Sequence, residues 1–359
     1  MARPRVELAA TVCGGCHTGS EQPQYDEWLT SGHAAVTEPD MNPDSCGRCH
    51  IGPARIAMLK GKPVPQNDHS VAVTCTVCHD PHGVHVFANV LNGMHANVVE
   101  GFPPVTITNT ELGAIYTNQL RNPIASTNDY FLTTSDVFLS KYDPDINVCA
   151  QCHNHRGALW TSSSRPPHHS PQYNILLGTV GELDTGNAAT NSAPGTHYLT
   201  EKQCVDCHMQ TAAHQNGPPE VAAVTGHTFV MNSYEVCAKC HGSAANAEDL
   251  RRLILTPAIT NGINSVLGDL QNWATNKAPI SLRTKYGARA WEYTTPGELS
   301  SGGSGPNSTE QALIPDNIKK ARFNLYLVVN DGSVGVHNPH HCLNLLDFAS
   351  GWVQQELNE

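Results

Sequence analysis

The stretch Cys204-Val205-Asp206-Cys207-His208 contains two cysteines three positions apart, followed at once by a histidine. The same pattern occurs six times in the 359-residue chain, at residues 13–17, 46–50, 75–79, 149–153, 204–208 and 237–241. It is the attachment signal of a c-type haem: both thiols form thioethers with the porphyrin, and the histidine is the proximal iron ligand. The sequence therefore predicts six covalently bound haem c groups with their irons, and points first to electron transfer.

The predicted attachment residues are two cysteines and one histidine per motif. The cysteines are Cys13, Cys16, Cys46, Cys49, Cys75, Cys78, Cys149, Cys152, Cys204, Cys207, Cys237 and Cys240. The proximal histidines are His17, His50, His79, His153, His208 and His241. Zinc sites and redox dithiols also use paired cysteines, but neither needs a histidine after every pair. A disulfide framework would not fix this spacing six times.

The one cysteine outside the motifs is Cys342, which lies in the apolar run Cys342-Leu343-Asn344-Leu345-Leu346. We expect a buried, inert thiol there. No other cysteine remains, so the motifs account for the rest of this residue type.

The composition is lean in core-forming residues: 39% are hydrophobic and 6% aromatic. Six porphyrins would supply the missing apolar surface, while 29 glycines and 24 prolines favour turns over long regular elements. We therefore expect a multihaem cytochrome fold of mostly irregular coil, with α-helices wrapped around a haem chain and few short strands. A haem-free helical region is expected at the C-terminal end.

The charge of the chain bears on which classes of partner it binds. The formal net charge is −11, and no basic stripe indicates nucleic-acid binding. No run approaches the roughly 18 apolar residues of a membrane span, so no transmembrane segment is predicted. No signal peptide follows Met1-Ala2-Arg3-Pro4-Arg5. Because prokaryotes attach haem c outside the cytoplasm, we expect an exported protein numbered from near its mature terminus. A lipid anchor on a removed segment stays an open alternative.

The motif positions suggest four parts. Residues 1–100 form a three-haem N-terminal part, and residues 101–147 form an insertion with neither cysteine nor histidine, suited to short strands or an ordered surface loop. Residues 148–243 form a three-haem C-terminal part. Residues 244–359 form a helical region that closes on the haems and supplies His337. Apolar spacing predicts helices over about 244–275, 309–330 and 339–357, with Pro257 kinking or splitting the first.

The histidines outside the motifs outnumber the six distal positions, so we expect bis-histidine ligation throughout. Such ligation gives low-spin iron of low potential and leaves no position for a substrate, which argues against an enzyme. The predicted distal ligands are His33, His82, His169, His197, His227 and His337. The reserves are His69, His95, His155 and His168.

The C-terminal half resembles a known scaffold over about residues 165–345. The matching segments are Thr196-His197, residues 204–208, Gly226-His227-Thr228-Phe229, residues 237–241 and Gly335-Val336-His337. This arrangement looks like that of ammonia-forming cytochrome c nitrite reductases and their multihaem relatives. The resemblance implies that His197, His227 and His337 are distal ligands. Those reductases carry one motif ending in lysine at the catalytic haem, whereas all six motifs here end in histidine, so the resemblance implies the scaffold rather than the catalysis.

The leading functional hypothesis is electron transfer through six closely packed haems. The chain is also similar to extracellular cytochromes that polymerise into conductive filaments, or nanowires, which implies copies of itself as partners and an extracellular or cell-surface location. Redox partner cytochromes or extracellular electron acceptors are the other expected partners. The alternatives are a monomeric periplasmic electron shuttle, and a multihaem reductase acting on nitrite, hydroxylamine or a sulfur oxyanion at one open haem.

Overall fold

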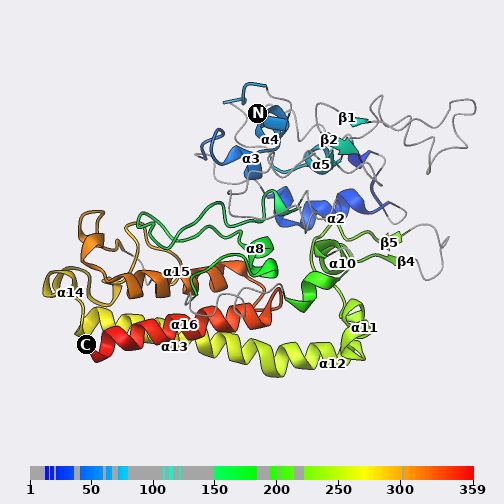
Figure 1. Ribbon diagram of the computed structural model, residues 1–359. Coiled ribbons are helices and arrows are strands. Elements are labelled where there is room, and N and C mark those ends of the chain that lie inside the picture. Colours follow the sequence, from blue (N-terminus) through cyan, green and yellow to red (C-terminus); the bar gives the residue numbers. More distant parts are fainter. Residues whose placement is uncertain are drawn as a thin grey trace, which may run out of the picture. The chain divides into compact units, whose positions relative to one another are not determined.

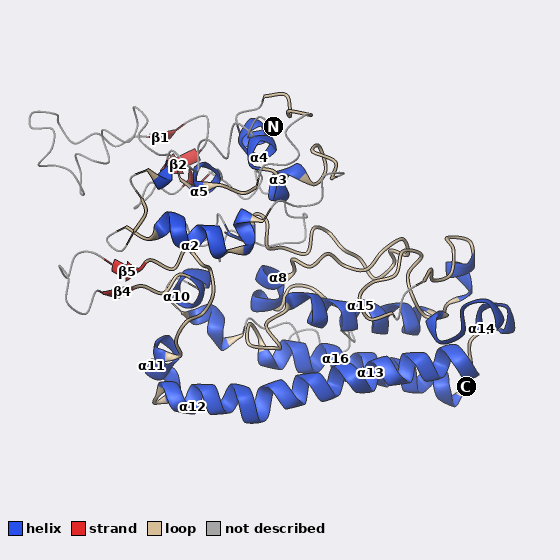
Figure 2. Cartoon of the chain, turned by 180° about the vertical axis from the view of Figure 1, so that it is seen from behind, coloured by secondary structure: helices blue, strands red, loops and turns tan. Residues whose placement is uncertain are grey.

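Helices and irregular segments make up most of the described chain, and its strands are short (Figures 1 and 2). This confirms the predicted mixture of coil, helices and few strands. Among the described residues, no helix is both long and apolar enough to cross a membrane. The computed structural model describes residues 13–15, 17–19, 22–35, 41–59, 62–66, 72–79, 108–109, 113–115, 121–122, 149–183, 195–200, 203–213, 222–300 and 303–359.

Some predicted residues fall outside this part of the chain. Cys16 and His82, together with the reserve histidines His69 and His95, lie outside the described residues.

The chain divides into two compact units. The first comprises Met1–Tyr130, Val137–Cys152 and Glu201–Val236, and the second comprises Phe131–Asp136, His153–Thr200 and Cys237–Glu359. The first unit therefore carries the cysteine pairs of five motifs, and the second carries His153, the sixth motif and the C-terminal helices.

The first unit is built from short elements. Its helices are α2 (Gln24–Thr30), η1 (Gly32–Ala34), α3 (Gly47–His50), α4 (Gly52–Leu59), α5 (Cys75–Cys78) and α10 (Cys204–His208). Strands β1 (Thr108–Asn109), β2 (Gly113–Ile115) and β3 (Arg121–Asn122) form an antiparallel sheet in that order. Strands β4 (Ala212–Ala213) and β5 (Ala222–Val224) form an antiparallel pair. The first sheet lies within 101–147, where short strands were one of the two predicted arrangements.

The attachment motifs adopt helical turns. Helices α5 and α10 begin at the first cysteine of a motif, and the sixth motif spans η7 (Glu235–Cys237) and α11 (Ala238–His241). Residues i, i+3 and i+4 lie on one face of a helix. A single helical turn therefore presents both thiols and the histidine of a motif on the same side.

Helix α2 is fixed next to the third motif. Trp28 is buried against Ala72, and its indole Nε1 donates to the Val73 carbonyl oxygen at 3.0 Å. Since Val73 lies two residues before Cys75, this contact ties α2 to the start of the motif.

The second unit is mainly helical. It contains α8 (Gln172–Leu177), η6 (Thr196–Leu199), α12 (Ala244–Asp249), η8 (Leu250–Leu255), α13 (Thr256–Asn276), α14 (Ile280–Tyr286), η9 (Gly287–Arg289), η10 (Glu310–Leu313), α15 (Asp316–Asp331) and α16 (Pro339–Asn358). Helices α13, α15 and α16 lie side by side in both views and share one apolar core (Figures 1 and 2).

The three helices predicted near the C-terminus are present, with two differences in detail. Pro257 does not split the first, because it lies in the opening turn of α13 behind the π-helical segment η8, and a wider turn accommodates a residue without an N–H. The second starts at Asp316 rather than near 309. Ile314 is extended before Pro315, as residues preceding proline usually are, which separates η10 from α15.

Cys342 lies in the core of the second unit with none of its surface exposed. Burial raises the pKa of its thiol well above the ordinary value, and the nearby Asp331 adds to the shift. The predicted burial of this thiol is confirmed. A buried thiol that stays protonated is a poor nucleophile, so the structure agrees with the expectation of an inert side chain.

Glu310 makes the stability of the second unit depend on pH. Its carboxylate accepts from Lys285 Nζ at 2.8 Å and from the Tyr286 hydroxyl, and these bonds lower its pKa from 4.5 to about 2. Because the folded pKa lies below the unfolded one, the carboxylate stabilises the fold above about pH 4.5. That contribution is lost as the pH falls towards 2.

We therefore expect Glu310→Gln to lower the urea midpoint slightly at pH 7 and to leave it unchanged near pH 2. Circular dichroism of wild type and variant at both pH values measures this. The exposed Asp347→Asn on α16 is the control and should match wild type throughout. An equal loss for Glu310→Gln at both pH values would contradict the assignment.

Candidate haem sites

The thiols of different motifs lie close together in the first unit. The side chains of Cys149 and Cys204 share a hydrogen bond. This bond and burial raise the pKa of Cys149 well above its ordinary value. Burial, and then Cys149 and Cys152, raise the pKa of Cys78 to about 12. The described cysteines form no disulfides. The attachment points of the third, fourth and fifth motifs are therefore neighbours, although they are far apart in sequence.

Two pairs of histidine rings face each other at the separation that one iron requires. The ring centroids of His79 and His227 are 6.1 Å apart, and so are those of His197 and His241. A metal–imidazole bond is about 2 Å long and the ring centre lies about 1 Å beyond its nitrogen, so two opposed ligands place their centroids about 6 Å apart. Each pair joins a predicted proximal ligand to a predicted distal one.

The backbone of the His227 segment is held by a carboxylate of α2. Glu27 accepts from the Thr225 N–H at 2.8 Å, from the Thr225 hydroxyl at 2.7 Å and from the His227 N–H at 2.7 Å. The Thr225 oxygen also lies 2.8 Å from His227 Nδ1. Because the hydroxyl donates its one hydrogen bond to Glu27, it accepts from His227 Nδ1–H. The lone pair of Nε2 is then left for a metal.

His227 is also electrically suited to bind iron. Burial lowers its pKa to about 4, and the nearby His79 acts in the same direction while Glu27 opposes both. The ring is therefore neutral at physiological pH, which is the form that ligates a metal.

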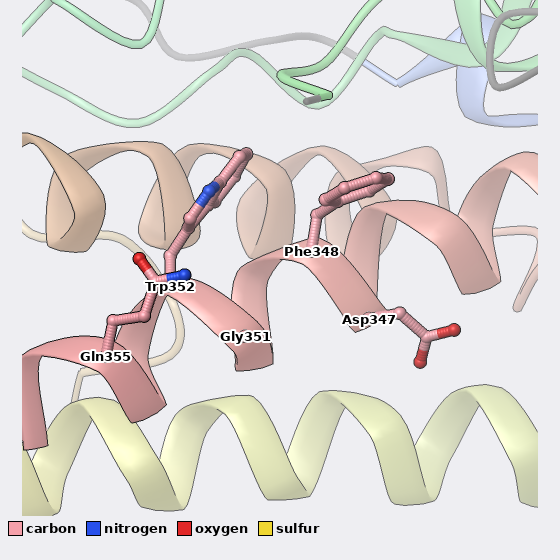
Figure 3. A pocket seen from close by; sticks show the side chains of 5 residues that line it. All are labelled: Asp347, Phe348, Gly351, Trp352 and Gln355. Atoms are coloured by element: carbon pink, nitrogen blue, oxygen red, sulfur yellow. The ribbon is translucent and has the colours of Figure 1, made fainter. Parts of the chain in front are cut away.

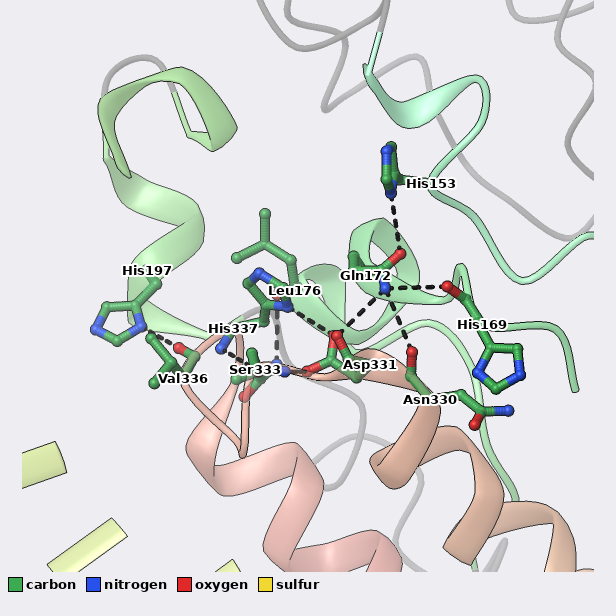
Figure 4. Close-up of polar contacts among 11 residues, drawn as sticks. His153, His169, Gln172, Leu176, His197, Asn330, Asp331, Ser333, Val336 and His337 are labelled. Carbon is green, nitrogen blue, oxygen red and sulfur yellow. Dashed lines mark hydrogen bonds and ion pairs between the residues drawn. The ribbon is translucent and has the colours of Figure 1, made fainter. Parts of the chain in front are cut away.

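In the second unit, His197 and His337 have the same orientation of ring nitrogens. His197 Nδ1 donates to the Val336 carbonyl oxygen, and His337 Nδ1 donates to Asp331 Oδ1 at 2.6 Å (Figure 4). Burial lowers the pKa of His337, but the charge and hydrogen bond of Asp331 outweigh it and the net pKa is raised. Both contacts leave Nε2 for a metal.

The loop that carries His337 has an unusual backbone. It joins the end of α15 to the start of α16, and both Val334 (φ 52°) and Gly335 (φ 85°) are left-handed. This conformation is rare for a β-branched residue. A Cβ on Gly335 would lie 2.7 Å from Ile259 of α13, so the loop is packed closely on the helical core.

Two proximal histidines are anchored in the same manner. His208 Nδ1 lies 3.0 Å from the Phe229 carbonyl oxygen. His153 Nδ1 lies 3.3 Å from Gln172 Oε1, and the amide nitrogen of Gln172 donates to the backbone oxygens of Asn330 and Asp331 (Figure 4). Gln172 therefore links the fourth motif to the end of α15.

Sequence reasoning missed the role of Phe229. Its ring meets the His33 ring edge-on, with centroids 4.4 Å apart, and lies 6.1 Å from His227. Its backbone is left-handed (φ 57°), and its carbonyl oxygen faces His208. One residue thus contacts three predicted iron ligands, and only its place two positions after His227 hinted at this.

The neighbouring His168 and His169 differ in their surroundings. His168 Nδ1 lies 3.0 Å from the Ser170 hydroxyl, which donates to the Asn154 carbonyl oxygen at 2.7 Å. His169 is exposed. The anchored geometry seen at the other candidates therefore belongs to the reserve His168.

Two further histidines are buried. His155, a reserve, is 5% exposed, and burial lowers its pKa to about 4. His341 lies in the first turn of α16 with Nε2 against the Val180 carbonyl oxygen at 2.7 Å. Because Nε2 is already engaged, His341 differs from the candidate ligands.

Two cavities lie in the described part of the chain, away from the candidate iron ligands. One of about 250 Å³ follows the surface of α16 and is lined by Asp347, Phe348, Gly351, Trp352 and Gln355 (Figure 3). A second, of about 430 Å³, lies between α2 and the β4–β5 pair of the first unit, with Glu27 in its wall. Neither is lined by a candidate iron ligand.

Comparison of folds places the chain among known structures. No family model and no curated protein matches its sequence. The crystal structure of the outer cell wall cytochrome OcwA matches with a TM-score of 0.53 and 20% identity, over 94% of this chain and 51% of that one. The chain has a multihaem cytochrome fold.

A second solved structure agrees. The undecahaem cytochrome from the S-layer of Carboxydothermus ferrireducens matches with a TM-score of 0.50 and 18% identity, over 96% of this chain and 45% of its own. The chain thus spans about half the length of each of these cytochromes.

Gly226 offers a test of the His227 segment. It is left-handed (φ 80°), and a Cβ there would lie 2.4 Å from the Met209 backbone carbon. We expect Gly226→Ala to lower the free energy of unfolding by about 1–3 kcal/mol, as measured by urea titration. The control Gly268→Ala, in α13 with open space around it, should gain about 0.5–1 kcal/mol. Equal behaviour of the two variants would contradict this description.

Proposed function

We propose that the chain transfers electrons through six covalently bound haem c groups, each held by two histidines. The observation that carries the proposal is the pair of ring separations of 6.1 Å, His79 with His227 and His197 with His241. When bound, haem supplies one-electron iron chemistry. The cysteines of the six motifs attach the porphyrins and the motif histidines hold the irons on one face.

On the opposite faces, the ring separations support two of the ligands, and the sequence pattern or an anchored Nδ1 supports the others. His227 is the distal ligand for the third motif, and His197 for the sixth. His33 and His337 are distal ligands for other motifs, as the sequence predicted. His168, with its anchored Nδ1, takes the place of His169, and His82 stays a prediction.

The proposed ligation also bears on catalysis. With an imidazole on each face, an iron would have no coordination position open to a substrate, which supports a carrier over a reductase. The surrounding residues orient the rings of His197, His227 and His337 through Nδ1, which leaves Nε2 for the iron.

The neighbours in fold, described as an outer cell wall cytochrome and an S-layer cytochrome, support a proposal about the location. We place this chain outside the cytoplasm, at the cell surface or beyond, exchanging electrons with other cytochromes or extracellular acceptors. Assembly into a filament of copies remains part of the proposal; electron micrographs showing only dispersed particles at all concentrations would remove it.

The ligand pairs have a direct spectroscopic test. We expect His227→Ala and His197→Ala each to convert one low-spin haem to high spin, and the double variant to convert two, because each removes one iron ligand. Electron paramagnetic resonance of the purified oxidised protein counts them. The exposed His340→Ala is the matched control and should keep the wild-type spectrum.

The outcomes separate the alternatives. Unchanged low-spin spectra in both histidine variants would overturn the assigned pairs. A high-spin signal in the wild-type protein, from an iron with one open face, would favour the reductase. Mass spectrometry of the intact chain checks the count of six haems.

A further inference from the structure

Three candidate distal histidines face Nδ1 acceptors of increasing negative charge. His197 faces the neutral backbone carbonyl of Val336. His227 faces the hydroxyl of Thr225, which donates a hydrogen bond to Glu27. His337 faces the carboxylate of Asp331 directly, at 2.6 Å.

The carboxylate of Asp331 is fixed in place. Its side chain has no exposed surface, and it ends α15, immediately before the left-handed Gly332. The Ser333 hydroxyl donates to its other oxygen. Among the described residues, His337 is the only basic side chain in ion-pair contact with Asp331. Its charge is therefore directed at the His337 ring and is not screened by water.

A negative charge on a ligand's far nitrogen makes that ligand a stronger electron donor. Such hydrogen bonds raise the basicity of a metal-bound imidazole, and they are one of the means by which a protein sets the potential of its haem iron. The ferric state, with one more positive charge, is stabilised over the ferrous state. The effect is greatest where the acceptor is a buried carboxylate, because the local dielectric is low.

We propose that Asp331 is a positioning residue that lowers the reduction potential of the iron bound by His337, making it lower than at the His227 and His197 sites. The inference rests on the proposed role of His337 as a distal ligand. The order of potentials follows the order of acceptor charge: Asp331 lowest, Glu27 through Thr225 intermediate, and the Val336 carbonyl highest among the three. The iron at His337 is accordingly the last of these three to be reduced in a reductive titration.

The test is a spectroelectrochemical titration of the complete six-haem protein. Asp331→Asn keeps an oxygen acceptor for Nδ1–H but removes the charge. We expect all irons to stay low spin and one midpoint potential, at the low end, to shift upwards. Glu27→Gln should raise a different midpoint by less. Asp347→Asn, the same change at an exposed position of α16, should move none.

Two further variants guard against a purely structural effect. Asp331→Glu keeps the charge and should retain the low potential. Ser333→Ala removes the hydroxyl that shares the carboxylate, so the charge acts more fully on His337 and the same midpoint should fall. A structural role alone predicts no downward shift, and an unchanged or raised midpoint in Ser333→Ala would overturn the inference even if Asp331→Asn failed to fold.

His337→Ala separates this inference from the proposed function. If it produces a high-spin haem while Asp331→Asn leaves every midpoint unchanged, the ligand role stands and the tuning role of Asp331 is wrong. If it leaves all haems low spin, the ligand role itself is wrong. The inference is supported only if both variants affect the same haem. His337→Ala should make that haem high spin, and Asp331→Asn should raise its potential.

Discussion

The proposed haem sites depend on the length of two iron–nitrogen bonds in line. Rings whose centres are about 6 Å apart can hold one metal between them; rings much further apart cannot. His79 and His227 satisfy this constraint although they are far apart in the sequence. Irregular segments can meet it because one ring of each pair is held at Nδ1: His227 by Thr225, and His197 by a backbone carbonyl.

The two units are stabilised by different means. In the second, α13, α15 and α16 bury a continuous apolar core that includes Leu270, Phe323 and Leu345. In the first, the described buried apolar residues are fewer, with Trp28 and Ala72 forming a small cluster. Helices this short are not stable in isolation, because too few hydrogen bonds offset the cost of nucleation. This fits the proposal that porphyrin faces complete the core of the first unit.

The features that could be predicted from the sequence depend on residues close together in it. The attachment residues follow from a fixed five-residue spacing, and α13 and α16 follow from apolar periodicity over many residues. The start of α15 was missed because an extended residue before Pro315 outweighed the helical pattern. Ligand pairing could not be derived, since it depends on contacts such as Glu27 with His227, which lie far apart in the chain and have no periodic signature.

The same limit explains why the number of histidines says little about potentials. In the proposed function each iron would have two imidazole ligands, so differences between sites would come from what the imidazoles contact. A backbone carbonyl, a hydroxyl backed by Glu27 and the buried Asp331 present three different fields to otherwise equal ligands. A chain of identical sites would give electrons no preferred order of filling. Under the proposed function, unequal acceptors would provide that order without opening any iron to substrate, which would suit conduction better than catalysis.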